Sequence, residues 1–247
     1  MLDALLDVLF PRRCAGCGSG AWPFCSACVA EAIALAPPWC ARCGLPAERE
    51  VALCRACPPR EIATARAPFL FGGPVRAAVH RLKFSGWRAV AEALAAAMVT
   101  VPPPGVRPEV VAWVPLSHRR LAERGFDQAA ALARVVGRQF GLPVEGLLLR
   151  TSDTSPQARR GGAERRAAMA GAFRVSGRPL PVTVLLVDDV LTTGATAGAC
   201  AHALLEAGAH SVHLLTAARA VSGPLPPRYT RFGSRPGLWL PGEEAPR

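Results

Sequence analysis

Lysine is almost absent from this chain. Of its 29 basic residues one is lysine, Lys83, and the other 28 are arginine. Because arginine fills every other basic position, a single lysine suggests a place that needs a compact ammonium rather than a planar guanidinium. We therefore include Lys83 among the candidate catalytic residues, although drift alone could also leave one lysine behind.

Long apolar runs are absent too. The longest, Ala91 to Val101, contains Glu92 and ends at three prolines, whereas a helix that spans a bilayer needs about 20 apolar residues. The first ten residues contain Asp3 and Asp7 and lack a basic leader, so we expect a short amphipathic helix there rather than a signal peptide. These absences predict a cytoplasmic protein without a membrane span.

Acidic residues are too few to balance the basic ones, and the imbalance lies beyond residue 60. Residues 1–60 carry 6 basic and 5 acidic side chains, whereas residues 61–247 carry 23 and 13. Between Pro115 and Arg178 there are 12 arginines against 5 acids. Such a surplus attracts polyanions such as pyrophosphate esters or nucleic acid. A solvated basic face in an arginine-rich proteome is the alternative.

Cysteine, by contrast, is plentiful, and eight of the nine cysteines form four Cys-x-x-Cys pairs. In a cytoplasmic protein such cysteines favour metal binding over disulfides. Two thiolates separated by two residues can hold one metal ion, and two pairs complete a tetrahedral zinc site. The predicted zinc ligands are Cys14, Cys17, Cys25, Cys28, Cys40, Cys43, Cys54 and Cys57.

Two structural zinc ions of this kind would make residues 1–60 a double zinc ribbon. Sixty residues with little apolar periodicity bury too little surface to fold alone, and metal binding would supply the missing stability. The pairs could join in sequence order or interleave, and a redox-active Cys-x-x-Cys is the alternative to zinc. Four thiolates leave no open position for chemistry, so we expect a docking role. The ninth cysteine, Cys200, is predicted to be a small buried side chain.

Residues 184–196 carry the most specific pattern in the chain. Four apolar residues predict a buried strand, Asp188 and Asp189 follow at its end, and a loop rich in threonine and glycine leads into a helix. The N–H groups of such a loop and the helix N-terminus attract phosphate. The two carboxylates can accept from ribose hydroxyls or lie near a magnesium ion. Two acids that merely cap the next helix are the alternative.

Strands alternating with helices through the rest of the chain predict an α/β fold with a parallel sheet. The expected strands are 109–114, 144–149, 173–175, 184–187 and 211–217, and the expected helices are 74–99 (with a break near Ser85), 119–140 and 197–207. Residues 61–71 are expected to bridge the cysteine-rich module to this sheet. Residues 151–171 read as an arginine-rich mobile loop, and a Pro/Gly-rich tail follows residue 220.

A second anion-binding loop is expected after the strand at 109–114. Ligands of such sheets lie beyond the carboxyl ends of the strands, which brings this turn beside the loop at 188–196. The turn offers backbone N–H groups, and nearby arginines can bind a pyrophosphate. The predicted residues are Pro115, Leu116, Ser117, Arg119, Arg120 and Arg124. His118 lies among them, and a solvated loop histidine is the favoured interpretation for it.

The 184–196 segment closely resembles the signature with which type I phosphoribosyltransferases bind phosphoribosyl pyrophosphate (PRPP). Together with residues 81–86, 114–117 and 124–128, it resembles the ComF (ComFC-type) family. The resemblance implies a type I phosphoribosyltransferase-like sheet flanked by helices, preceded by a zinc-ribbon module. The implied domains are residues 1–60, 61–220 and a tail at 221–247. In the family Asp127 is usually asparagine, and amides usually stand at Ala168 and Gly171.

The resemblance also implies a chemistry, with PRPP as ligand and Mg²⁺ as its companion. Asp188 and Asp189 would hold the ribose hydroxyls, and pyrophosphate would leave from ribose C1 toward residues 115–120. The 5-phosphate would be bound by Leu191, Thr192, Thr193, Gly194, Ala195 and Thr196. The loop at 151–171, with Arg159, Arg160, Arg165 and Arg166, would close over the site.

Two functions remain open at this point. One is a phosphoribosyltransferase-like protein of natural transformation (DNA uptake) or nucleotide salvage, with a DNA-uptake protein docked through the zinc ribbon. The other is a non-catalytic PRPP sensor that binds single-stranded DNA on its basic face. Its candidate stacking residues are Trp22, Trp39, Phe84 and Trp87, although buried aromatics would explain them equally.

Overall fold

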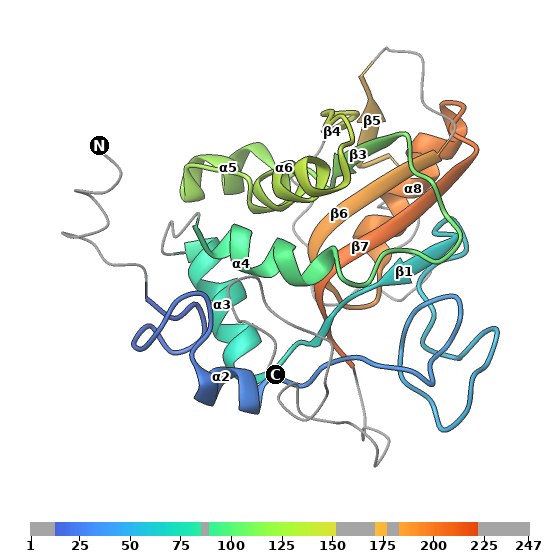
Figure 1. The fold of residues 1–247 in the computed structure, drawn as a ribbon. Helices are drawn as coiled ribbons and strands as arrows, with labels where there is room; N and C mark the ends of the chain where they lie inside the picture. The colour runs from blue at the N-terminus through green and yellow to red at the C-terminus, as the bar shows by residue number, and fades with distance from the viewer. Residues whose placement is uncertain (1–12, 85–88, 152–170, 177–182, 222–247) are drawn as a thin grey trace, which may run out of the picture.

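The structure is a computed structural model that describes residues 13–84, 89–151, 171–176 and 183–221. A parallel sheet lies at its centre, with helices on both faces (Figure 1). The strands are β1 (Thr64–Arg66), β2 (Phe69–Leu70), β3 (Val110–Trp113), β4 (Leu148–Arg150), β5 (Phe173–Val175), β6 (Thr183–Leu191) and β7 (Ser211–Arg219). The helices are α2 (Ser26–Glu31), α3 (Gly73–Phe84), α4 (Ala89–Met98), α5 (His118–Arg124), α6 (Gln128–Phe140) and α8 (Ala195–Glu206).

The sheet has the strand order β1-β7-β6-β3, and β2 also pairs with β7. Every pair in it is parallel. Its two central strands, β6 and β7, are mostly apolar and mostly buried along their length, as expected for strands covered on both faces. The predicted fold class, a parallel α/β sheet with flanking helices preceded by a cysteine-rich module, is confirmed.

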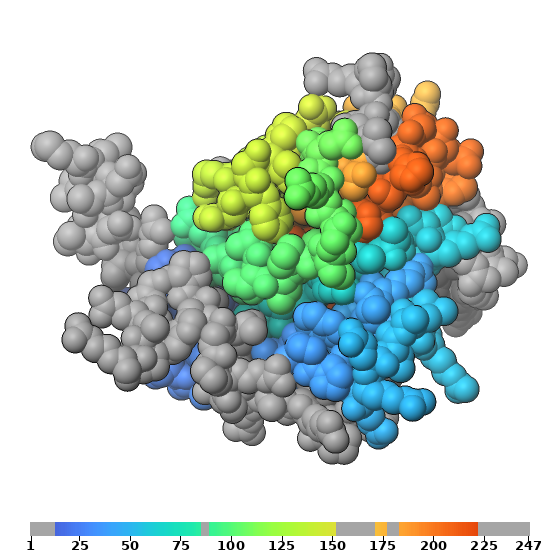
Figure 2. All heavy atoms as spheres, turned by 45° about the vertical axis from the view of Figure 1, so that its right-hand side comes forward, coloured from blue at the N-terminus to red at the C-terminus, as the bar shows by residue number. Residues whose placement is uncertain are grey.

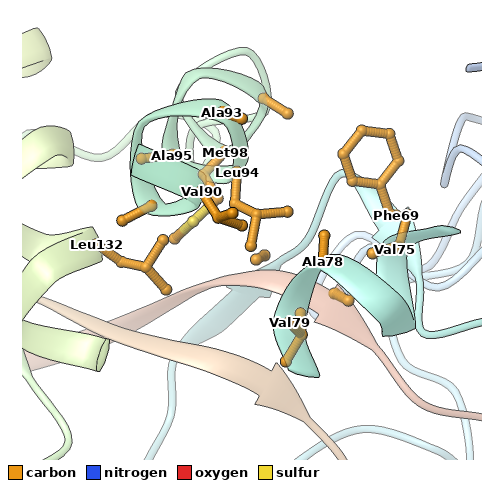
Figure 3. Close-up of a cluster of buried hydrophobic side chains, with 14 of the residues drawn as sticks. Phe69, Val75, Ala78, Val79, Val90, Ala93, Leu94, Ala95, Met98 and Leu132 are labelled. Atoms are coloured by element: carbon orange, nitrogen blue, oxygen red, sulfur yellow. The ribbon is translucent and has the colours of Figure 1, made fainter. Parts of the chain in front are cut away.

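Alternation along β6 divides the core into two layers. Leu185 and Val187 face the layer formed with α3, α4 and α6, part of which is seen in Figure 3. Val184 and Leu186 face the layer formed with α8. Because successive side chains of a strand point to opposite faces, the two acids that follow in this strand are directed to different layers.

Strand β6 is longer than predicted. The expectation was a strand over 184–187 with the acids just beyond it, but pairing with β7 continues to Leu191. Asp188 and Asp189 therefore lie inside the sheet and are fixed by its hydrogen bonds. The loop that follows is correspondingly short, because α8 begins at Ala195.

The prediction of one helix over 119–140 was wrong. Helix α5 ends at Gly125, whose φ of 72° is left-handed, a conformation that glycine adopts at little cost. Asp127 then caps α6 by accepting hydrogen bonds from the N–H groups of Ala129 and Ala130. The stop at Gly141 is confirmed. The sequence did not reveal this break, because the helical spacing of apolar residues continues across it.

Other boundaries shift for local reasons. The run at 74–99 forms two helices, α3 and α4, in agreement with the expected break near Ser85, and residues 85–88 between them lie outside the described residues. The expected strand at 144–149 contributes only a bridge from Val144 to Val111, and pairing resumes at Leu148 in β4. Gly146 separates the two parts and lies under the Trp113 ring. Strand β5 forms as predicted and pairs antiparallel with β4.

The bridge expected at 61–71 contains two strands, β1 and β2, that pair with β7. Strands of three and two residues are too short to produce a period-two pattern. The predicted helix at 1–10, residues 152–170 of the arginine-rich loop and residues 222–247 of the tail lie outside the described residues. Within the described ranges, no helix has both the length and the apolar character needed to cross a bilayer.

Candidate functional site

The eight paired cysteines form two clusters, each joined in sequence order. Cys14, Cys17, Cys25 and Cys28 make the first cluster, and Cys40, Cys43, Cys54 and Cys57 make the second. In each cluster the sulfur atoms lie within 4.8 Å of one another. A tetrahedron with zinc–sulfur bonds of about 2.3 Å has sulfurs about 3.8 Å apart. Sulfur–sulfur distances of 3.5 to 3.8 Å fit that geometry. Both clusters are therefore consistent with structural zinc.

The cysteine thiols differ from one another in pKa, and they do so within the second cluster as well as between the clusters. Hydrogen bonds with Ser19 lower the pKa of the exposed Cys17 to about 6. Burial favours a higher pKa for Cys40, but hydrogen bonds with Cys43, Cys57 and Arg42 outweigh it and lower that pKa to about 7. Burial raises the pKa of Cys43. Zinc binding would therefore displace protons, and metal affinity would fall in acid.

The two clusters pack against different parts of the sheet domain (Figure 1). The first lies beside α3, where Arg81 donates hydrogen bonds to the backbone oxygens of Ala15 and Gly16. The second lies beside β1 and the end of β7, where Arg66 donates to the backbone oxygen of Ala41 at 2.7 Å. Figure 2 shows the blue and cyan residues of this module adjoining the body of the molecule.

The acidic pair in β6 meets the one lysine of the chain. The ammonium of Lys83 at the end of α3 lies 2.9 Å from Oδ2 of Asp189. That carboxylate is 6% exposed and the lysine side chain 23%, so the ion pair lies at the edge of the core. Sequence reasoning had named both residues but could not place them together, because 106 positions separate them along the chain.

Asp188 has a different environment on the opposite face of β6. Its Oδ1 accepts a hydrogen bond of 2.8 Å from the backbone N–H of Asp189. Burial, and then the neighbouring charge of Asp189, raise the pKa of Asp188 well above its ordinary value. Two adjacent carboxyls, one of them paired with an ammonium, form a site that a cation or a set of ligand hydroxyls would stabilise.

Arg124 and Asp127 complete the wall of the site on the side of α5 and α6. The Arg124 guanidinium lies 5.0 Å from the Phe84 ring centre and donates to Gln128 Oε1 at 2.9 Å. Burial lowers its pKa, whereas the charge of Asp189 opposes that change. Burial also raises the pKa of Asp127, and the charge of Asp189 adds to this effect.

Asp127 ties the predicted pyrophosphate loop to α6. Its Oδ2 accepts from the Leu116 N–H at 3.1 Å, while its Oδ1 caps the helix. Ser117 caps α5 by accepting from the Arg120 N–H at 3.4 Å. Sequence reasoning missed this role for Asp127, although an aspartate directly before a helical period is a capping signal.

The arginines of the pyrophosphate loop are not equivalent. Arg119 and Arg120 are exposed on α5, and Arg119 forms an ion pair of 2.8 Å with Glu123. Arg124 alone of the three is half-buried and stands near Asp189. His118 is exposed, as the favoured interpretation expected.

The loop between β6 and α8, predicted to bind phosphate, is short and carries three threonines around Gly194. Thr192 and Thr193 are exposed, and Thr196 is half-buried in the first turn of α8. Gly194 precedes the helix with a φ of 76°, which favours glycine over any other residue. The loop thus brings threonine hydroxyls and the N-terminus of α8 directly after the acidic end of β6.

A cavity of about 490 Å³ opens beside the pyrophosphate loop, between the end of β3, helices α5 and α6, and β4. Sequence reasoning did not predict it, because its walls come from three separate stretches of the chain, 113–121, 126–134 and 146–150. Its lining includes Trp113, Leu116, His118, Phe126, Arg134 and Arg150.

The proposed stacking aromatics do not form one surface among the described residues. Trp39 lies under the Arg66 guanidinium in the cysteine module, 5.2 Å from its carbon, whereas Phe84 lies at the acidic site. Trp22 packs against the core layer of α3 and α4. Trp87 and the four loop arginines lie outside the described residues. Cys200 is buried, as predicted.

The fold and the site together define a class of protein. Its members join a parallel α/β domain, with two acids at the end of a central strand, to a module of two four-cysteine clusters. Residues 5–58 match the family model described as a double zinc ribbon domain. The DNA utilization protein YhgH of Escherichia coli O157:H7 is 31% identical over 209 residues, which cover 79% of this chain and 89% of that protein. The chain therefore belongs to the family of YhgH and the ComF competence proteins.

Two further similarities are partial. The competence protein ComFC of Streptococcus pneumoniae is 35% identical over 106 residues, 43% of this chain and 46% of that protein. A solved structure described as the allosteric regulatory enzyme of purine biosynthesis is 21% identical, with a TM-score of 0.38, over 56% of this chain and 27% of that one.

Proposed function

We propose that this protein binds PRPP at the carboxyl end of β6. The observation that carries the proposal is the junction of three features in one place: the acidic pair of β6, the Lys83 ammonium 2.9 Å from Asp189, and the Thr-Gly loop before α8. A site for an anionic sugar phosphate needs groups that accept hydrogen bonds from the ribose hydroxyls, and N–H or hydroxyl groups that donate to the phosphate. This junction offers both.

Each part of the site takes one part of the ligand. Asp188 and Asp189 accept from the ribose hydroxyls. The loop at 191–196 donates to the 5-phosphate from its hydroxyls and N–H groups. The pyrophosphate lies toward the turn at 115–117, which Asp127 holds in place through Leu116. Arg124 and Lys83 contribute positive charge on that side.

Magnesium fits this donor set, because hard cations prefer carboxylate and phosphate oxygens. Asp188 and Asp189 would hold it, and it would neutralise part of the charge on the pyrophosphate. As an enzyme the protein would be a phosphoribosyltransferase, with the Lys83 ammonium stabilising negative charge that develops on the leaving group. A cytoplasmic location suits the reduced thiols of its cysteine clusters.

Single-stranded DNA is a second candidate ligand. The observation that favours it is the cavity beside β3, which combines aromatic walls from Trp113 and Phe126 with Arg134 and Arg150. Stacking surfaces next to cations are the usual means of binding unpaired nucleotides. The relatives carry the names DNA utilization protein and competence protein. We extend that role, in DNA uptake or nucleotide salvage and with a protein partner on the zinc module, to this chain.

Turnover and DNA binding can be separated in one preparation. Labelled PRPP is incubated with the protein and a panel of nucleobases, and pyrophosphate release is measured in wild type and in Asp188→Ala. Release that depends on one base and on Asp188 supports a transferase. Folded wild-type protein that binds PRPP without release for any base contradicts the transferase and supports a sensor.

The DNA arm uses a labelled oligonucleotide at several salt concentrations. Binding that weakens with salt, survives Asp188→Ala and is lost in Arg134→Glu supports the cavity as the DNA site. Binding that is unchanged in Arg134→Glu contradicts it.

A further inference from the structure

The second cysteine cluster touches the predicted phosphate loop through two prolines. Pro58 and Pro59 directly follow Cys57. A Cβ added at Gly194 would lie 2.9 Å from Cβ of Pro58, and one added at Gly198 would lie 2.8 Å from Cγ of Pro59. Both distances are too short for a real side chain, so only glycine fits. The two prolines therefore pack directly on the loop and on the first turn of α8.

An arginine of the metal-binding knuckle holds these prolines in place. Arg42 lies between Cys40 and Cys43, and its Nη2 donates to the backbone oxygens of Pro59 at 2.7 Å and of Ile62 at 2.9 Å. The Ile62 N–H in turn donates to the Pro59 oxygen at 3.1 Å. The position of Pro59 thus depends on the conformation of the knuckle that the metal would fix.

A second link runs through the end of β7. Arg219 is buried and donates to the backbone oxygen of Ala56, which lies between the ligands Cys54 and Cys57. The next residue, Ala220, donates its N–H to the backbone oxygen of Leu191 at 2.8 Å. Leu191 is the last residue of β6 and the first of the phosphate loop. The cluster is therefore connected to both ends of that loop.

The charges of nearby arginines also favour the position of the second cluster against the sheet domain. A zinc ion with four thiolates carries a formal charge of about −2. Arg66 and Arg219 are each 2% exposed and lie beside the second cluster, where Arg66 donates to the Ala41 oxygen at 2.7 Å. A buried cation needs a counter-charge of this kind, and a metal site supplies one without any flexible side chain.

We propose that the second cysteine cluster, when it holds zinc, positions the phosphate loop, so that Pro58, Pro59 and Arg42 act as positioning residues for the ligand. The inference rests on the proposed function where it concerns PRPP, but the link between metal and loop stands on contacts alone. The first cluster contacts α3 instead, and it provides the matched control.

The test compares the zinc-loaded full chain with Cys43→Ser and Cys17→Ser, each of which removes one ligand from one cluster. Hydrogen exchange of the backbone at 191–200 is followed by mass spectrometry, with zinc content measured in parallel. We expect exchange to be about tenfold faster in Cys43→Ser and unchanged within about twofold in Cys17→Ser. Equal protection of the loop in wild type and Cys43→Ser overturns the proposal.

Arg42→Ala keeps the test valid if Cys43→Ser fails to fold, because it leaves all eight thiolates in place. We expect this variant to retain both zinc ions, and we expect backbone hydrogen exchange at 191–200 to be faster than in wild type by about threefold or more. Retained zinc with wild-type loop exchange overturns the role of Arg42.

Reciprocity gives an independent readout on the ligand side. If zinc favours PRPP binding, PRPP must raise the equilibrium zinc affinity of the second cluster by the same factor, measured by competition with a chelator, and leave that of the first cluster unaffected. Wild-type protein that binds no PRPP contradicts the proposed function, while the exchange experiment still decides the link between cluster and loop. PRPP binding without any change in the equilibrium zinc affinity of the second cluster overturns the coupling.

Discussion

At the scale of single residues, the most unusual feature is the presence of two adjacent carboxyl groups inside a parallel sheet. One ammonium, that of Lys83, lies against Asp189, while Asp188 faces the other layer and has a raised pKa caused first by burial. Buried like charges oppose folding, and a chain retains them where a ligand later compensates them. On the proposed function, the acidic pair trades stability of the fold for binding of the ligand.

That trade predicts the behaviour of Asp188→Asn. A carboxyl whose folded-state pKa is raised stabilises the fold below its unfolded pKa of about 3.9, and this stability is lost as the pH rises toward the folded-state value. The amide keeps the acceptor for the Asp189 N–H and removes the charge. We expect the variant to be more stable at pH 7 by about 1 kcal/mol or more in urea unfolding, and to have lost PRPP binding. A variant less stable than wild type at pH 7 contradicts this view of Asp188.

Lys83→Arg tests whether the site needs a compact ammonium. A guanidinium keeps the charge but is larger and planar, and the carboxylate it must reach is 6% exposed. We expect PRPP affinity to fall about tenfold while thermal stability changes little, measured by calorimetry and by unfolding. Arg76→Lys, an exposed position about two turns earlier in α3, is the control for a general effect of basic substitutions in this helix. Unchanged PRPP binding in Lys83→Arg refutes the role.

At the scale of elements, the parallel sheet and the start of α8 could be predicted because their residues carry short apolar runs between helical periods and a distinctive loop. The break between α5 and α6 could not, since the helical period continues across Gly125 and hides it. Strands β1 and β2 are defined by pairing with β7 rather than by their own residues. The cavity and the Lys83–Asp189 contact depend on segments far apart in the chain.

The prediction at the scale of elements concerns Asp127, because its carboxylate connects the turn after β3 to the start of α6. Asp127→Ala removes the α6 cap and the acceptor for Leu116, and we expect a loss of about 1–3 kcal/mol in urea unfolding. Asp127→Asn retains one oxygen for the cap and should lose less. Equal stability of wild type and Asp127→Ala contradicts the assignment of this contact.

At the scale of the molecule, the described residues form a sheet domain that is contacted at two places by the four-cysteine clusters. The cysteine spacing predicted two tetrahedral sites, but left open which pairs join, because pairing depends on how the chain folds between them. The structure joins them in sequence order and sets each against a different region, α3 for the first cluster and the β7–α8 region for the second. Docking on the sheet domain, and not only on an outside partner, is thus part of the module's role.

Binding of PRPP at the end of β6 is the central claim, and calorimetric titration of the zinc-loaded chain tests it most directly. Wild type and Asp188→Ala are titrated with PRPP with and without Mg²⁺, and Arg138→Ala at the exposed end of α6 serves as control. We predict one PRPP per chain with a Kd between about 1 μM and 1 mM, dependent on Mg²⁺, retained in the control and lost in Asp188→Ala. A folded, zinc-loaded wild type that binds no PRPP, or equal affinity in Asp188→Ala, would contradict the account.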